Sequence, residues 1–100
     1  MGGYEVHIEL SSDPEKALSK YPETKNAEWG AETDGIAIHC KDEGRSFVFL
    51  KHNASAGNVA HESWHVVRRM MNWLGVDLDN EAVAYHLGYL VNRIVEAQRR

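Results

Sequence analysis

The sequence predicts a single α+β domain, in which a small antiparallel sheet of about three strands packs on a C-terminal pair of long helices. Three short segments in the first half of the chain alternate apolar and polar residues, with the period of a half-buried strand. Two long segments in the second half repeat their apolar residues with the period of a helix. At 100 residues, the chain can bury one modest core.

The first part of the chain, about residues 1–54, is expected to form a β-rich scaffold. A short helix should begin at Pro14, with Ser12 or Asp13 as its N-cap, and end before Tyr21. Residues 22–34 are polar and typical of turns. The other segments predict three strands, over residues 4–10, 35–40 and 46–51, of which the last two form a hairpin across residues 41–45.

The second part, about residues 55–100, is expected to form the two long helices. The first helix has an apolar stripe at helical spacing, made by Val59, Val66, Val67, Met70 and Leu74. Asn53 or Ser55 can cap its start, and Gly75 occupies the position where a left-handed residue commonly ends a helix. A tight connection over residues 76–79 then leads to a second helix, from about Asn80 to Arg99.

The first long helix contains the string His61-Glu62-Ser63-Trp64-His65, which has the pattern HExxH. Residues four apart lie on one face of a helix, about one turn apart, so both imidazoles can bind a single zinc ion. Glu62 stands beside that ion and is a candidate general base. Zinc in a hydrolase normally takes three protein ligands and keeps one position for water, so a further ligand is expected from elsewhere in the chain.

The second long helix offers that ligand, because Glu81 lies in its first turn, with fifteen residues between it and His65. Here the chain resembles the gluzincin branch of the zincin metallopeptidases, in which a second helix carries a Glu ligand inside an Asn-Glu-x-x-Ala-like string. The resemblance covers about the last 45 residues and rests on His61, Glu62, His65, Asn80, Glu81 and Ala84. It implies a minimal zincin-like domain with His61, His65 and Glu81 as zinc ligands and Glu62 as general base.

The activity that this resemblance implies is that of a zinc-dependent metallopeptidase, similar to small metallopeptidase-like proteins of bacteria and their phages. Such a hydrolase cleaves peptide bonds with a zinc-activated water, and Glu62 would pass the proton of that water to the leaving amine. His65 lies about two and a half turns before the end of its helix, so Glu81 can reach the metal only if the helices cross at a wide angle.

The chain departs from the gluzincin pattern four residues after Glu81. Gluzincins often carry an acidic residue there, which hydrogen-bonds a zinc-binding histidine, whereas this chain has Tyr85. Tyr85 or His86 is a candidate donor to the developing oxyanion, and either is also explained as a packing residue. Asp77 and Asp79 compete with Glu81 as third ligand, although their turn and N-cap positions explain both.

Some residues of the β-rich scaffold also bear on a site. His7 and His39 alternate with apolar neighbours, so both are expected to point away from the apolar face of their strands and into solvent. Residues 47–54, which lead into the motif helix, are candidates either for pairing with an extended peptide or for plain sheet structure. Cys40 is the single cysteine, so no disulfide is expected and a reducing interior is the expected environment.

The composition of the chain indicates which kinds of binding partner to expect. The net charge is −4, and arginines at helix ends complement the helix dipole, so no nucleic-acid partner is expected. No signal peptide or transmembrane run is visible, which predicts a cytoplasmic protein without a membrane partner. A domain of this size has no second lobe, so a peptide or protein substrate would meet a shallow groove, or one completed by a partner protein or a second copy.

Three interpretations follow from the sequence. The leading one is the zinc metallopeptidase. The second is a non-catalytic zinc-binding interaction or regulatory protein, possible for a phage- or prophage-derived chain, in which the metal mainly stabilises a small fold. The third is a helical-hairpin interaction module without metal, whose contact surface would be formed by Trp64, Trp73, Tyr85 and Tyr89.

Overall fold

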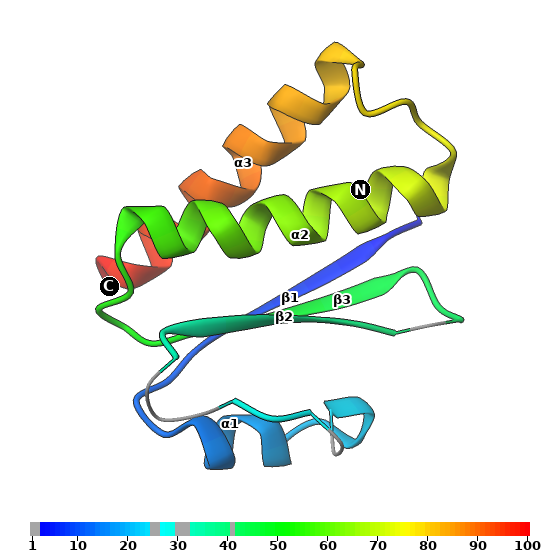
Figure 1. The fold of residues 1–100 in the computed structure, drawn as a ribbon. Coiled ribbons are helices and arrows are strands. Elements are labelled where there is room, and N and C mark those ends of the chain that lie inside the picture. The colour runs from blue at the N-terminus through cyan, green and yellow to red at the C-terminus, as the bar shows by residue number, and fades with distance from the viewer. Residues whose placement is uncertain (1–2, 25–26, 30–32, 41) are drawn as a thin grey trace.

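The fold stacks three layers, with a sheet between two long helices on one side and a short helix on the other (Figure 1). The computed structural model describes residues 3–24, 27–29, 33–40 and 42–100. Along the chain the elements are β1 (Glu5–Leu10), α1 (Pro14–Ser19), the short 3₁₀ helix η1 (Pro22–Thr24), β2 (Gly35–His39), β3 (Arg45–Leu50), α2 (Ala56–Leu74) and α3 (Glu81–Gln98). The predicted α+β class is confirmed. Lys41, in the predicted hairpin connection, and parts of the predicted turn region lie outside the described residues.

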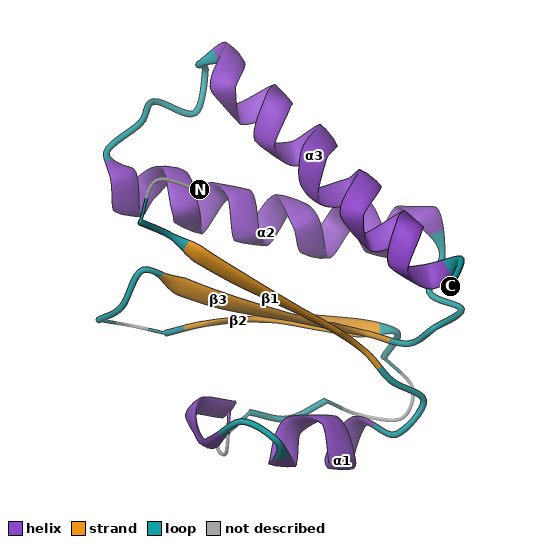
Figure 2. Cartoon of the chain, turned by 180° about the vertical axis from the view of Figure 1, so that it is seen from behind, coloured by secondary structure: helices purple, strands orange, loops and turns teal. Residues whose placement is uncertain are grey.

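The sheet is mixed rather than antiparallel (Figure 2). Its strand order is β1-β3-β2, with β1 parallel to β3 and β2 antiparallel to β3. The prediction of an antiparallel sheet is therefore wrong for the β1–β3 pair. Period-two alternation assigns side chains to a face of a strand but does not choose the neighbouring strand, and here the hairpin inserts β3 between β1 and β2.

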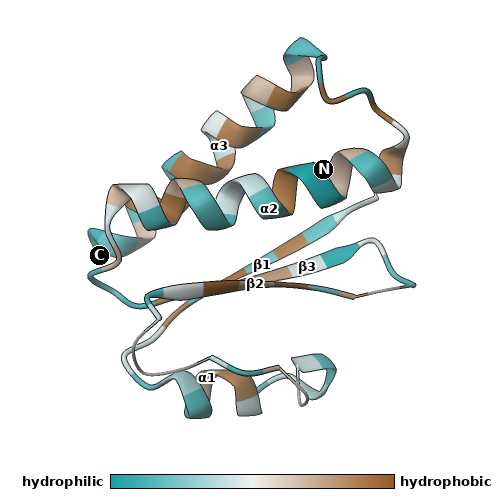
Figure 3. Cartoon of the chain, viewed as in Figure 1, coloured by the Kyte–Doolittle hydropathy of each residue, from teal (hydrophilic) through white to brown (hydrophobic). Residues whose placement is uncertain are grey.

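Both faces of the sheet are covered. Val48 and Leu50 of β3 join the main core with the apolar sides of α2 and α3. Phe47 and Phe49, which alternate with them, point to the other face and pack under α1 with Trp29. Apolar residues accordingly occur in all three layers (Figure 3). The second core was not predicted, because Trp29 is an isolated aromatic residue in a polar stretch of sequence.

This outer layer changes the surroundings of His7. Its ring stacks on Phe47, with the ring centroids 5.0 Å apart, and lies near Tyr21. His7 points away from the apolar face of β1, as predicted, and 42% of its side chain is exposed, but α1 and the segment after it cover part of the face that the strand pattern assigns to solvent.

The two long helices begin and end where local signals place them. Ser55, rather than Asn53, is the N-cap of α2, and its side chain accepts a hydrogen bond from the backbone N–H of Asn58. Gly75 ends α2 with a φ of 73°, a left-handed conformation that glycine adopts without a Cβ penalty. Asn80, rather than Asp79, is the N-cap of α3, and its side chain accepts a hydrogen bond from the backbone N–H of Ala82. Among the described residues, no helix combines the length and the hydropathy that crossing a bilayer requires.

Ser63 provides a test of the main core. It is fully buried, and its hydroxyl has no hydrogen-bond partner among the described residues. Replacing it by alanine removes an unpaired polar group with little change in volume, so Ser63→Ala is expected to raise the free energy of unfolding by about 1 kcal/mol in urea denaturation.

Ser46→Ala is the matched control, because the equally buried hydroxyl of Ser46 is hydrogen-bonded to Tyr4 and His39. Its loss leaves buried partners unpaired and is expected to lower the free energy of unfolding by about 1–3 kcal/mol. If Ser63→Ala destabilises as much as the control, the core is packed differently from this description.

Candidate metal site

The two histidines of the HExxH string meet on the surface of α2. Their Nε2 atoms are 3.2 Å apart, and the two rings lie edge to face with centroids separated by 4.7 Å. Two nitrogens that each bind a tetrahedral zinc at about 2.0–2.1 Å are themselves about 3.3 Å apart. The His61 and His65 rings thus already have the spacing that a shared zinc ion requires, although an N–H···N hydrogen bond between two imidazoles has similar dimensions.

Glu62 approaches the same point from the buried side of the helix. Consecutive residues are rotated by about 100° around a helix, so Glu62 turns from the exposed flank of the histidines toward the sheet. Only 9% of its surface is exposed. One donor atom from each of His61, Glu62 and His65 lies within 4.8 Å of the others. The group therefore combines two imidazoles with a shielded carboxylate, a donor set suited to zinc.

Strand β2 lies beside this part of α2. At one end, the side-chain amide of Asn58 donates to the carboxylate of Asp34, at 2.8 Å. At the other end, the Arg69 guanidinium donates to the carbonyl of Cys40, at 3.3 Å. Residue numbers increase from the first contact to the second in both elements, so β2 and α2 run in the same direction. The histidine pair lies between the two contacts on α2, so β2 runs past it.

The outer edge of β2 is the free edge of the sheet on this side. Backbone hydrogen bonds from Lys51 to Asp34 and from Cys40 to Arg45 mark the residues whose peptide groups face β3. In an antiparallel ladder such residues alternate with residues whose N–H and C=O groups point away. Gly35, Ala37 and His39 therefore turn their backbone groups away from β3, and those of Ala37 and His39 lie at the open edge, whereas Gly35 is buried.

For residues 47–54, this arrangement favours the alternative of plain sheet structure over pairing with a peptide. The strand that leads into α2 is β3, which is the central strand and pairs on both sides. Its backbone is therefore occupied, and β2 is the strand beside α2 that can pair with an extended chain.

His39 is exposed and points away from the face of its flanking isoleucines, as predicted, but it also contacts the sheet. It shares a face of the sheet with Ser46, opposite it in register, and its Nδ1 lies 2.8 Å from the Ser46 hydroxyl, which also hydrogen-bonds the buried Tyr4. His39 therefore lies on the α2 side of the sheet and stays exposed. Burial lowers the pKa of His39, and the nearby positive charge of Arg69 lowers it further.

Glu81, the expected third ligand, lies outside the group formed by His61, Glu62 and His65. It is the first residue of α3, whose start stands off from α2, above the C-terminal half of that helix (Figure 1). His65 is nine residues before the end of α2, or about 14 Å along the helix axis. Among the described residues, no donor from another element joins the two histidines and Glu62.

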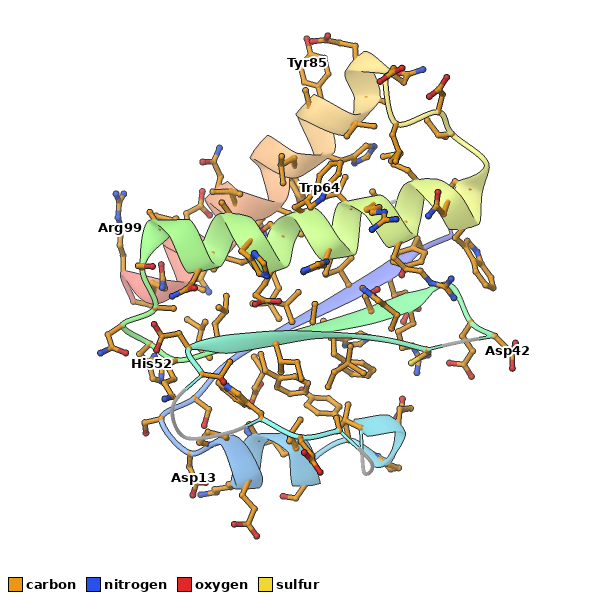
Figure 4. The ribbon with its side chains drawn as sticks, in the orientation of Figure 1. Asp13, Asp42, His52, Trp64, Tyr85 and Arg99 are labelled. Carbon is orange, nitrogen blue, oxygen red and sulfur yellow. The ribbon has the colours of Figure 1, made fainter. Side chains whose placement is uncertain are left out.

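The other candidate site residues, Tyr85, His86 and Asp77, lie on α3 or just before it. Tyr85 projects from the start of α3 with 73% of its surface exposed (Figure 4), and His86 is half-buried on the next position. Their role as oxyanion donors stays a prediction. Asp77 accepts a hydrogen bond from the backbone of Asp79, which fits the turn role that the sequence also allowed.

The aromatic residues of the third interpretation are all exposed, but they lie in different surroundings. Trp73 packs against the Arg69 guanidinium, whereas Tyr89 lines a hollow with β1 on the far edge of the sheet. Tyr85 stands at the start of α3, and Trp64 lies midway along α2 (Figure 4). The four side chains are therefore distributed over the helix pair rather than gathered in one contact surface.

A scan against protein-family models finds no match, and searches of curated proteins and of solved structures find no significant similarity. The resemblance to gluzincins thus stays a prediction made from the residues, and the site must be judged on its geometry.

Sequence reasoning missed His39 and Arg69 as neighbours of the site. A signal for His39 was present, because Ala37 and His39 share a strand face and the flanking isoleucines share the other. Both faces are apolar, however, so the pattern alone does not say which one meets the motif helix.

The position of Glu81 is tested by Glu81→Gln, which removes its charge and keeps its shape. Because the structure places Glu81 away from the histidines, we expect zinc affinity to change by no more than about twofold, measured by competition with a chromophoric chelator. A third ligand would instead contribute a loss of about 100-fold or more. Glu96→Gln, an exposed glutamate on the same helix, is the matched control.

Proposed function

We propose that this protein is a zinc-dependent metallopeptidase whose metal is bound by His61 and His65. The observation that supports this most directly is the 3.2 Å separation of the two Nε2 atoms with the shielded Glu62 carboxylate beside them. Imidazole binds zinc as the neutral ring, and two rings at this distance can share one ion without rearranging the helix.

Glu62 would be the general base. A zinc ion at this site would supply Lewis acidity, polarising a carbonyl and lowering the pKa of water toward about 7. Glu62 lies close enough to accept a proton from water near the histidine pair and later to release it to the leaving amine. Its shielded position keeps the carboxylate facing the site rather than bulk solvent.

The substrate would be an extended peptide bound along β2. The outward peptide groups of Ala37 and His39 can form the ladder hydrogen bonds of an added strand. Because β2 runs alongside α2, a chain bound there passes the histidine pair. The backbone would provide most of the affinity in this arrangement, and neighbouring side chains would select the sequence.

A second candidate function is favoured by one observation: all three members of the group come from a single helix. With no donor from another element among the described residues, Glu62 itself is available as a ligand. Zinc held by two histidines and Glu62 would leave no base beside it. The protein would then be a zinc-binding interaction or regulatory protein without turnover.

Histidine substitutions test the metal. Purified without an affinity tag that binds metals, the protein is expected to contain about one zinc per chain by elemental analysis. His61→Ala and His65→Ala should each lose it, whereas His52→Ala, an exposed histidine before α2, should keep it (Figure 4). Equal zinc content in all four proteins would reject the proposed site.

Glu62→Gln separates the two functions. For the peptidase, this change should preserve zinc content and lower chelator-sensitive cleavage of an unstructured protein by about 100-fold or more. If Glu62 is a ligand instead, the same change weakens zinc binding. Wild-type protein that holds zinc and cleaves nothing, with Glu62→Gln deficient in metal, would favour the non-catalytic function.

A further inference from the structure

A hollow next to the histidine pair is lined almost entirely by cationic and imidazole groups. It has a volume of about 290 Å³ and is bordered by His39, His65, Arg68, Arg69 and Asn72. Each lining side chain carries nitrogen donors, and no carboxylate is among them. The chain as a whole has a formal net charge of −4, so this group of basic side chains contrasts with the rest of the protein.

The two arginines of the hollow are presented in different ways. Arg69 is half-buried, with its guanidinium bonded to the Cys40 carbonyl and lying 5.7 Å from the centre of the Trp73 ring. These contacts hold its side chain at the wall of the hollow. Arg68 is exposed, and it forms no ion pair with any residue that the structure describes.

The field within the hollow is positive. Arg69 and His65 both act to lower the pKa of His39, beyond the effect of burial. A positive field that disfavours a further proton favours a bound anion for the same reason. Arginine is also the side chain best matched to a carboxylate, since its planar fork can donate two parallel hydrogen bonds.

The hollow lies along the path of the peptide in the proposed function. His65 belongs to both sites, and Arg68, Arg69 and Asn72 follow it by one to two turns along α2. A chain antiparallel to β2 has its N-terminal side toward His39, so it would offer the hollow a side chain that precedes the scissile bond. A chain parallel to β2 would offer its C-terminal side instead, including a terminal carboxylate.

We propose that this hollow is a carboxylate-binding subsite that selects peptide substrates with an anionic group one or two residues from the cleaved bond. Its role in substrate selection rests on the proposed function, whereas carboxylate binding by the hollow can be measured without any turnover. The volume suits one side chain or one chain terminus rather than a whole ligand.

Three small probes identify the source of the carboxylate. N-acetylglutamate α-amide carries only a side-chain carboxylate, N-acetylglutamine carries only a terminal one, and N-acetylglutamine amide carries neither. Each would be titrated into metal-free and zinc-loaded protein, following the backbone amide NMR signals of residues 38–40 and 65–72. Zinc content would be measured on the same samples, so that failure of the metal site and failure of the subsite are recorded separately.

We expect one of the two acids to shift the signals around the hollow and the neutral amide not to. Arg68→Gln should weaken that binding by about threefold or more, because it removes an exposed cationic donor without touching the core. Arg99→Gln removes an exposed arginine at the far end of α3 and should bind like the wild type (Figure 4). Preference for the side-chain acid supports the antiparallel peptide, and preference for the terminal acid supports the parallel one.

Two results would overturn the proposal. One is that all three probes give equal shifts, or none. The other is that the wild type and Arg68→Gln bind the acids equally, as they would if a carboxylate bound zinc directly. Protein that takes up no zinc when zinc is supplied, yet binds an acid through Arg68, would refute the metallopeptidase function while leaving the carboxylate site established.

Discussion

The enclosure of β3 is the constraint on which the rest of the structure depends. This strand pairs on both sides and is buried on both faces, with Val48 and Leu50 against the long helices and Phe47 and Phe49 against the outer layer. A strand buried on all sides fixes its neighbours, because a shift by one residue would exchange its two apolar faces. The position of β2 as an open edge beside α2 follows from that register.

The candidate site uses the part of α2 that the core does not need. The core takes one side of the helix, through Val59, Val66 and Met70, and leaves His61 and His65 on an exposed flank. Glu62 lies at the boundary between the two, which explains how one helix supplies both exposed ligands and a shielded carboxylate. In the proposed function this flank can act on a peptide only because β2, which would bind the peptide, runs beside it. The metal site on the helix and the edge of the sheet would therefore act together.

Local signals in the sequence predicted the helices and strands well. They did not predict which elements pack together, because that depends on residues far apart in the chain. Pro14, Ser55, Gly75 and Asn80 act on their own backbone or within a turn of it, so they placed the helix ends without knowledge of the fold. Strand order and the outer layer depend on residues distant in sequence, which alternation does not encode. The same limit applies to Glu81, because its distance from the histidines is set by the crossing of two helices and by the loop between them.

The buried contact between Tyr4, Ser46 and His39 has a consequence for the hollow beside the metal site. The two hydroxyl hydrogens can rotate, so the chain of hydrogen bonds can run from tyrosine to histidine or in the reverse direction. In the first case Nδ1 of His39 accepts and the opposite ring nitrogen carries the proton; in the second case the two nitrogens exchange roles. Reversing the chain therefore takes two hydroxyl rotations and a change of His39 tautomer, in which one ring nitrogen releases a proton to solvent and the other takes one up, so the tautomer of an exposed imidazole is coupled to two hydroxyl groups inside the sheet.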